Sequence, residues 1–109
     1  MNAATDPLRR DTLLTLLFPA DAEEVVIDHL LEHPEGARGF TCVLVDGHGA
    51  TMPPRDAAER VRGRSRRFQV QIALARSQAD ALVAHFRSVL ANPDVVFWMV
   101  PLTAFGRMS

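Results

Sequence analysis

Residues Phe40–Leu74 read FTCVLVDGHGATMPPRDAAERVRGRSRRFQVQIAL. Phe40–Asp46 is an apolar, β-branched run, and within Phe68–Leu74 apolar residues alternate with Gln and Ala. This period of two is typical of a strand with one buried face and one wetter face. The stretch therefore predicts two strands joined by a long loop, which opens at Gly47-His48-Gly49.

The segment before this stretch predicts a strand followed by a helix. Thr12–Phe18 is a short apolar run that ends at Pro19, which predicts a strand. Asp21 with Glu24 has the spacing of a capping box, and the apolar residues that follow recur at helical spacing until Pro34.

The segment after it predicts a helix followed by a strand. Ser77 with Asp80 predicts the start of a second helix, which ends at Asn92-Pro93-Asp94, and Val95–Val100 predicts a last strand. The predicted order is β-α-β-β-α-β. We therefore predict an α+β fold, a ferredoxin-like sandwich with a long loop between the second and third strands.

The first and last strands are apolar on both faces. Leu13 and Leu17 alternate with other apolar residues of the first strand, and Val96 and Trp98 do so in the last. Two helices cover only one face of a sheet, whereas strands buried on both faces are apolar throughout. We therefore expect another subunit to cover the open face; the alternative is a monomer with an exposed apolar patch, which soluble monomers avoid.

Composition limits the class of protein. A chain of 109 residues that is 48% apolar predicts one domain, which we place at residues 12–106 after a flexible tail at residues 1–11. The net charge of −1 argues against nucleic acid or an anionic membrane as a partner. One cysteine excludes an internal disulfide and Cys-rich metal motifs. Leu13–Phe18 is too short to span a bilayer, so we expect a cytoplasmic protein that is not embedded in a membrane.

Positive charge is concentrated in the second half of the chain. Residues 55–109 contain nine Arg and four acidic residues, and every basic residue of the chain is Arg. Arginine binds phosphate and carboxylate through two parallel hydrogen bonds. In an extended segment alternate arginines share one side, which predicts an anion-binding surface; the alternative is a solvated hairpin neutralised by Asp56 and Glu59. The arginines of this cluster are Arg60, Arg62, Arg64, Arg66 and Arg67.

Two sequence features that would indicate binding of nucleic acid or nucleotide are absent from this cluster. No aromatic residues interleave with the arginines, so a nucleic-acid platform is not expected. No glycine-rich phosphate-binding motif is present either.

Histidines are the candidate ligands for a divalent metal ion. His48 lies between Gly47 and Gly49, which expose its imidazole, and Asp46 can orient or share an ion. The alternative is a tight turn with an incidental histidine. His29 and His33 are four residues apart on one helix face, the spacing at which two imidazoles can share a metal. Their alternative is a solvated helix face.

Two other reactive side chains are predicted to have structural roles. Cys42 alternates with Phe40 and Leu44 in a strand, so we expect a small buried hydrophobe rather than a nucleophile. His85 lies on the flank of the second predicted helix and is expected at a boundary of the core. No catalytic residues are predicted.

Several segments together carry a resemblance to a known family. They are Leu14–Pro19, Gly39–Thr41, Val45–Gly49, Glu59–Arg64, Arg67, and Trp98 with Pro101. In these segments the chain resembles a small family of PII-like proteins, within the nitrogen-regulatory PII/CutA-like superfamily, that is associated with heavy-metal efflux systems. The resemblance implies a compact homotrimer with ligand clefts between subunits and a mobile signalling loop, which we place at residues 50–62.

The chain also departs from nitrogen-regulatory PII proteins. Their T-G-x-x-G-D-G-K phosphate-binding segment has no counterpart between Ala75 and Trp98, so ATP binding in their manner is not expected. The tyrosine that is modified in some of their loops is missing too, because the chain contains no Tyr.

The leading hypothesis is a non-enzymatic trimeric sensor whose loop responds to a metal ion or a small anion and alters contact with a partner such as a metal efflux pump. In it His48 is a ligand, Gly47 and Gly49 are hinges, and Arg60, Arg62 and Arg64 contact the anion or partner. The alternatives are a dimeric ferredoxin-like barrel enzyme acting on a small organic substrate, and a ligand-free interaction module.

Overall fold

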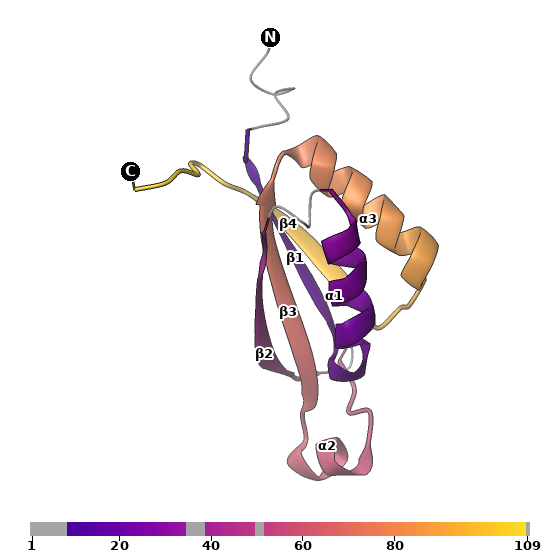
Figure 1. Cartoon of the computed structure of the whole chain (residues 1–109). Helices are drawn as coiled ribbons and strands as arrows, with labels where there is room; N and C mark the ends of the chain where they lie inside the picture. The colour runs from indigo at the N-terminus through magenta and orange to yellow at the C-terminus, as the bar shows by residue number, and fades with distance from the viewer. Residues whose placement is uncertain (1–8, 35–38, 50–51, 109) are drawn as a thin grey trace.

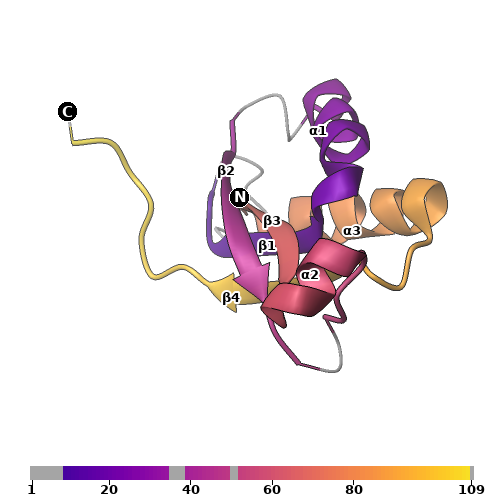
Figure 2. The same ribbon diagram turned by 90° about the horizontal axis from the view of Figure 1, so that it is seen from below.

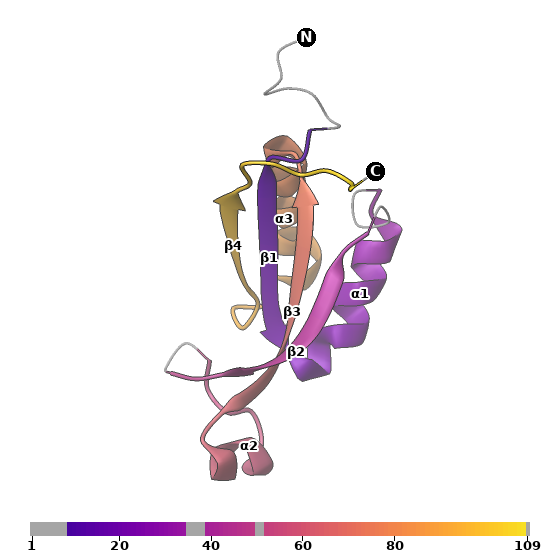
Figure 3. The same ribbon diagram turned by 90° about the vertical axis from the view of Figure 1, so that its left-hand side faces the viewer.

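A computed structural model describes residues 9–34, 39–49 and 52–108 of the chain. These residues form a four-stranded antiparallel sheet in the order β2-β3-β1-β4 (Figure 3). Its strands are β1 (Thr12–Pro19), β2 (Thr41–Gly47), β3 (Ser65–Leu74) and β4 (Val96–Pro101). The sheet order and the sequence of elements confirm the predicted ferredoxin-like arrangement.

Two long helices cover one face of this sheet. They are α1 (Glu23–Glu32) and α3 (Arg76–Leu90), and both lie on the same side of the strands (Figures 1 and 2). Alternate residues of β1 and β3 point toward them, as the period of two predicts. The resulting core consists of Leu14, Leu16, Phe18, Val26, Leu30, Val70, Ile72, Leu74, Ala79, Leu82, Val83 and Phe86.

The start of α1 differs from the prediction. The residue before the helix is Ala22 and it makes no side-chain capping bond, so the predicted capping box of Asp21 and Glu24 does not form. Pro19 ends β1, and a 3-10 turn, η2 (Ala20–Ala22), leads directly into the helix. The backbone of this turn takes the place of a side-chain cap, because the N–H of Glu23 donates to the carbonyl of Ala20.

The second long helix begins slightly earlier than predicted. It starts at Arg76, where the side-chain carbonyl of Gln78 accepts a hydrogen bond from the N–H of Ala75 at 3.0 Å. Asp80, predicted to help start the helix, instead pairs with Arg76 one turn away at 3.0 Å. The helix ends at Leu90, before Asn92-Pro93 as predicted.

The long connection between β2 and β3 contains a helix of its own, α2 (Ala57–Arg62), which the sequence analysis did not predict. It lies beyond the end of the sheet (Figures 1 and 3). The third strand also begins at Ser65, three residues before the predicted Phe68. Residues 50 and 51 of the predicted mobile loop lie outside the described residues.

The other face of the sheet carries no helix. Val43, Trp98 and Val100 point to this open face, and 52%, 40% and 42% of their surfaces are exposed. Other parts of this face are covered: Thr15 and Leu17 of β1 are buried, and Arg67 and Met52 lie against Gly47 at the end nearest α2. The two-sided apolar character that the sequence predicts for β4 therefore leaves a surface open in the single chain.

The chain enters and leaves the sheet at the same end. The N–H of Leu102, just after β4, donates to the carbonyl of Asp11, just before β1, at 2.8 Å. Arg10 also donates to the carbonyl of Ala73 at 2.8 Å, so this part of the predicted N-terminal tail is tied to β3. Residues 1–8 of that tail lie outside the described residues. Beyond Leu102 the chain runs across the end of the sheet opposite α2 (Figure 3), where the Phe105 ring lies 4.9 Å from the guanidinium carbon of Arg10.

Candidate functional site

The connection between β2 and β3 is held together by the carboxylate of Glu59. Its side chain is 5% exposed, and Oε1 accepts from the N–H of Arg55 at 2.7 Å while Oε2 accepts from the N–H of Arg66 at 2.9 Å. Arg55 precedes α2 and Arg66 follows it. One buried carboxylate therefore joins the segments before and after α2, and we call this arrangement the Glu59 clamp.

The charge of the clamp is well compensated. The N–H groups of Arg55 and Arg66 are the largest causes that lower the pKa of Glu59, and the Ser65 hydroxyl and the charge of Arg67 act in the same direction. Burial opposes them, but the pKa of Glu59 is lowered on balance. The clamp is therefore ionised at neutral pH, as a charge-assisted acceptor should be.

Both ends of α2 have a capping residue. Asp56 precedes the helix and its Oδ1 accepts from the N–H of Glu59 at 2.8 Å. Gly63 ends it in the left-handed conformation, with φ 71°, and donates to the carbonyl of Glu59 at 2.9 Å. Asp-Ala-Ala-Glu at residues 56–59 has capping-box spacing, so this signal for α2 was present in the sequence.

Arg67 lies beneath the connection and is 1% exposed. Its Nε donates to the hydroxyl of Ser65 at 2.9 Å, Nη1 to the carbonyl of Asp94 at 3.2 Å and Nη2 to the carbonyl of Pro53 at 3.4 Å. Its guanidinium thus points into the protein, unlike that of the exposed Arg66 beside it. The structure gives Arg67 the position of an internal bridge, away from any ligand in solution.

Gly47 is buried against this bridge. A Cβ atom there would lie 2.9 Å from Sδ of Met52 and 3.2 Å from Cγ of Arg67. Only glycine leaves room for this contact. Gly49 has open space around it and a φ of 99°, which favours glycine for conformational reasons. The two glycines beside His48 thus meet different requirements.

A second set of contacts links the connection to the rest of the domain. The guanidinium of Arg55 pairs with Asp94, in the turn between α3 and β4, and with Asp21 in η2 at 3.2 Å. Three segments far apart in the chain meet at this one cation. The base of the connection is therefore fixed on the side of the helices by Arg55 and on the open face by Arg67.

The remaining arginines of the cluster are exposed. Arg60 and Arg62 are in α2, where residues two apart do not face the same side, so the prediction of one extended row of arginines is wrong. Arg64 pairs with Asp46 at 3.5 Å. Within the described part of the chain, Arg60, Arg62 and Arg66 have no carboxylate within ion-pair distance.

The candidate metal ligands lie in two separate places. His48 is exposed after the end of β2, near Asp46, which is engaged by Arg64. His29 is in α1, whereas His33 follows the last residue of the helix in an extended conformation, so the two do not share a helix face as predicted. Both lie beside His85 of α3, with ring centres 5.7 Å and 5.5 Å from that of His85. Across residues 9–34, 39–49 and 52–108, no three His, Cys, Asp or Glu side chains are placed to hold one metal ion.

Cys42 is exposed, so the expectation of a buried cysteine is wrong. It faces the helix side of β2, which is the outer strand of the sheet and is incompletely covered. Partial burial, followed by the charge of Glu23, raises the pKa of its thiol. A raised pKa disfavours the thiolate that a nucleophile requires.

The comparison with known proteins matches this architecture. Residues 8–109 match the family DUF3240, described as a protein of unknown function. The chain belongs to this family. The crystal structure of a DUF3240 family protein from Shewanella baltica OS155 is similar, with a TM-score of 0.71; the two chains are 21% identical over 93% of this chain and 99% of the other. No curated protein matches the chain.

A second solved structure has the same fold. It is CPII, a nitrogen regulatory PII-like protein from Thiomonas intermedia K12, bound to ADP, AMP and bicarbonate. The similarity has a TM-score of 0.64 with 15% identity, over 92% of this chain and 98% of CPII. The fold of this DUF3240 chain is thus PII-like, as the sequence resemblance implied. None of the helices that the structure describes is long and apolar enough to cross a bilayer.

Proposed function

We propose that this chain is a non-enzymatic, PII-like regulatory protein that responds to a small oxyanion through the connection between β2 and β3. The observation that carries the proposal is the Glu59 clamp, which holds α2 as a preformed unit beyond the sheet. This unit presents Arg60 and Arg62 without carboxylate partners among the described residues. Exposed guanidinium groups on a rigid support favour bidentate anion binding.

The ligand we propose is bicarbonate or phosphate rather than a nucleotide. CPII was solved with ADP, AMP and bicarbonate, so an oxyanion is among the ligands of a protein with this fold. The turn between α3 and β4 here reads Ala91-Asn92-Pro93-Asp94 and contains no glycine-rich segment to hold a row of phosphates. A single oxyanion needs only two or three donors, and one guanidinium supplies two parallel N–H groups, so Arg60 and Arg62 need not face the same side of α2.

We further propose that the protein works as a homotrimer in which the open sheet faces cover one another. The exposed Val43, Trp98 and Val100 support this assembly, since a soluble monomer rarely leaves such a face uncovered. The regulated partner we propose, following the family resemblance, is a heavy-metal efflux pump contacted by α2. In that assembly the arginines of one subunit can share an anion with the next subunit.

The test is an NMR titration of the protein with bicarbonate, phosphate, chloride, AMP and ADP at constant ionic strength. The matched variants are a double change, Arg60→Gln with Arg62→Gln, and a control, Arg87→Gln, at an exposed arginine of α3. We expect saturable shifts with bicarbonate or phosphate that weaken about tenfold or more in the double variant and are kept in the control. Equal shifts with chloride, or no dependence on the α2 arginines, would refute the proposal.

His48 supports a second candidate, a divalent metal ion as the signal. It is exposed beside Gly49 and close in sequence to Asp46, but a tight site would need ligands from a neighbouring subunit. Calorimetric titration with Cu²⁺, Zn²⁺ and Ni²⁺ on wild type and His48→Ala tests this candidate. Binding that depends on His48 supports this candidate. Binding unchanged by the substitution would exclude His48.

A further inference from the structure

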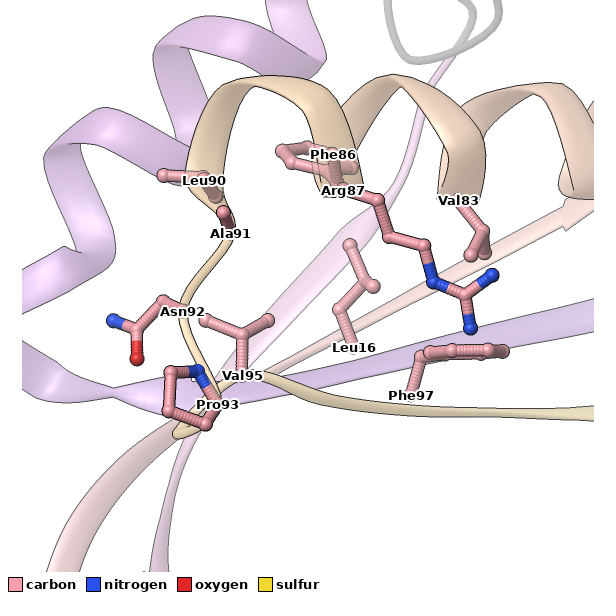
Figure 4. Close-up of a pocket in the computed structure, with 10 residues that line it drawn as sticks. All are labelled: Leu16, Val83, Phe86, Arg87, Leu90, Ala91, Asn92, Pro93, Val95 and Phe97. Carbon is pink, nitrogen blue, oxygen red and sulfur yellow. The ribbon is translucent and has the colours of Figure 1, made fainter.

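A pocket of about 370 Å³ lies between α3 and the sheet, at the side of β4 (Figure 4). Val83, Phe86 and Leu90 of α3 form one wall, and Leu16, Val95 and Phe97 form the other. Most of its lining is apolar, and its volume is within the range of roughly 300–1,000 Å³ that is usual for small-molecule sites. It is on the helix side of the sheet, so it is separate from the open face and from α2.

Arg87 is the single charged side chain in the lining of this pocket. Its guanidinium carbon lies 5.3 Å from the centre of the Phe97 ring, and Figure 4 shows the group stacked above that ring. A cation–π contact of this kind holds the charge in place without neutralising it. Unlike Arg76 and Arg55, Arg87 has no carboxylate partner in the described part of the chain.

The opposite end of the pocket has a different polarity. It is formed by Asn92 and Pro93, just past the last turn of α3. The C-terminal end of a helix carries partial negative charge, which disfavours an anion. Arg87 is also in the last turn of α3, but its guanidinium is directed away from Asn92 and Pro93 and lies over Phe97 (Figure 4). An anionic group is therefore favoured only at the Arg87 end of the pocket. The apolar wall between the two ends suits a hydrocarbon chain or ring.

We propose that this pocket binds a small apolar monocarboxylate, with its carboxylate on Arg87 and its apolar body between α3 and β4. The guanidinium offers two parallel N–H donors that match a carboxylate, and it is already positioned by Phe97. Removal of water from the apolar walls supplies the non-directional part of the binding free energy. This ligand class differs from the oxyanion proposed for α2, and the two sites share no residue.

The experiment compares three probes with the same chain and different head groups: decanoate, 1-decanol and decylamine, all below their aggregation concentrations. Binding is followed by NMR titration of the full-length protein. We expect decanoate to bind at least about tenfold more tightly than 1-decanol, a gap that reflects the paired charge. Decylamine should bind more weakly still. The shifts should centre on amides of Val83, Phe86 and Leu90.

Substitution then tests the role of the cation. Arg87→Gln should weaken decanoate binding about tenfold and leave 1-decanol unchanged, and Arg62→Gln, at an exposed arginine of α2, should change neither. A second variant, Val95→Phe, fills the pocket and should abolish binding of both probes. If Val95→Phe does not fold, the comparison of the three probes and the effect of Arg87→Gln still show whether the pocket binds a carboxylate.

Three outcomes would overturn the inference. They are equal affinity for decanoate and decylamine, unchanged decanoate affinity in Arg87→Gln, and shifts centred on the open sheet face, which would mean that the probes only cover exposed apolar surface. The result is independent of the oxyanion proposal, because Arg87→Gln keeps oxyanion binding in that proposal and weakens decanoate binding in this one.

Discussion

The guanidinium of Arg67 donates to the backbone carbonyl of Asp94 at 3.2 Å, and the two residues lie on opposite sides of β1 in the sheet. Arg67 lies in β3, while Asp94 lies in the turn that leads into β4. The Arg67 side chain therefore passes across β1 near Pro19, which is the residue of β1 that pairs with Arg67. Asp94 is also the residue whose carboxylate pairs with Arg55. One turn thus receives both arginines that fix the base of the β2–β3 connection.

Replacing Arg67 by Met should lower the free energy of unfolding by about 3 kcal/mol, because three acceptors lose their donor in a buried place. These are the hydroxyl of Ser65 and the carbonyls of Asp94 and Pro53. Urea unfolding at a fixed protein concentration measures the change. Arg66→Met, at the exposed neighbour, is the control and should change stability by less than about 0.5 kcal/mol. Equal changes in the free energy of unfolding for the two variants would contradict the assignment of Arg67 as an internal bridge.

Glu59→Gln should loosen α2 without unfolding the sheet. The amide keeps one acceptor oxygen and loses the second, so the N–H of either Arg55 or Arg66 is left without its partner. Limited trypsin digestion should then cleave within Arg60–Arg64 several times faster than in wild type. Glu24→Gln, an exposed glutamate at the start of α1, serves as the control. Unchanged cleavage would show that the clamp does not hold the connection.

The lowered pKa of Glu59 gives this behaviour a dependence on pH. A carboxyl whose pKa is lower in the folded state contributes its full stabilisation above the unfolded value, which is about 4.3 for glutamate. That contribution is lost as pH falls from there through the lowered folded value. Wild type should therefore become more sensitive to an acid-active protease such as pepsin below about pH 4. Glu59→Gln should show a smaller change over the same interval.

Gly47→Ala should destabilise the protein by about 1–3 kcal/mol, since the added methyl group overlaps Met52 and the stem of Arg67. Gly106→Ala is a suitable control, because a Cβ there meets no atom within 4 Å. Thermal unfolding of the two variants makes the comparison. Equal stability of both would mean that Met52 moves aside without cost.

Trp98→Glu should dissociate the proposed trimer, since it places a charge on the open face, where 40% of the Trp98 surface is exposed in the single chain. Val61→Glu is the control: Val61 is 87% exposed on α2, away from that face. Light scattering after size exclusion gives the mass of each. A wild-type monomer at micromolar concentration would exclude the trimer, and a trimeric Trp98→Glu would exclude this face as its interface.

The sequence predicted the sheet better than the candidate site. The alternation in β3 has the period of two of a strand, and the continuous apolar runs of β1 and β4 are typical of strands with two apolar faces; both patterns placed these strands within a few residues. The capping box predicted at Asp21 and Glu24 does not form. Asp21 has the right spacing, but it lies in η2, where the backbone N–H of Glu23 already bonds to the carbonyl of Ala20. The same spacing at Asp56 and Glu59 was read only as neutralising charge.

The missed features of the site are long-range contacts. The period of two places Arg66 and Arg67 on opposite faces of β3, but it does not show that Arg67 is the buried one. Arg67 is buried because Pro53 of the connection and Asp94 of the α3–β4 turn lie over it. The link from Arg55 to Asp94 spans 39 residues and depends on how the α3–β4 turn meets the connection. His85 likewise joins His29 and His33 only because α1 and α3 pack side by side.

The hydrogen bond between Leu102 and Asp11 has a practical consequence for studies in which the protein is immobilised. Because the backbone enters and leaves the sheet at one end and α2 projects from the other, an anchor attached at either end of the chain holds the molecule with α2 facing solution. A biosensor surface prepared in this way leaves the arginines of α2 accessible. Helix α2 can then be presented directly to anions or to a candidate pump.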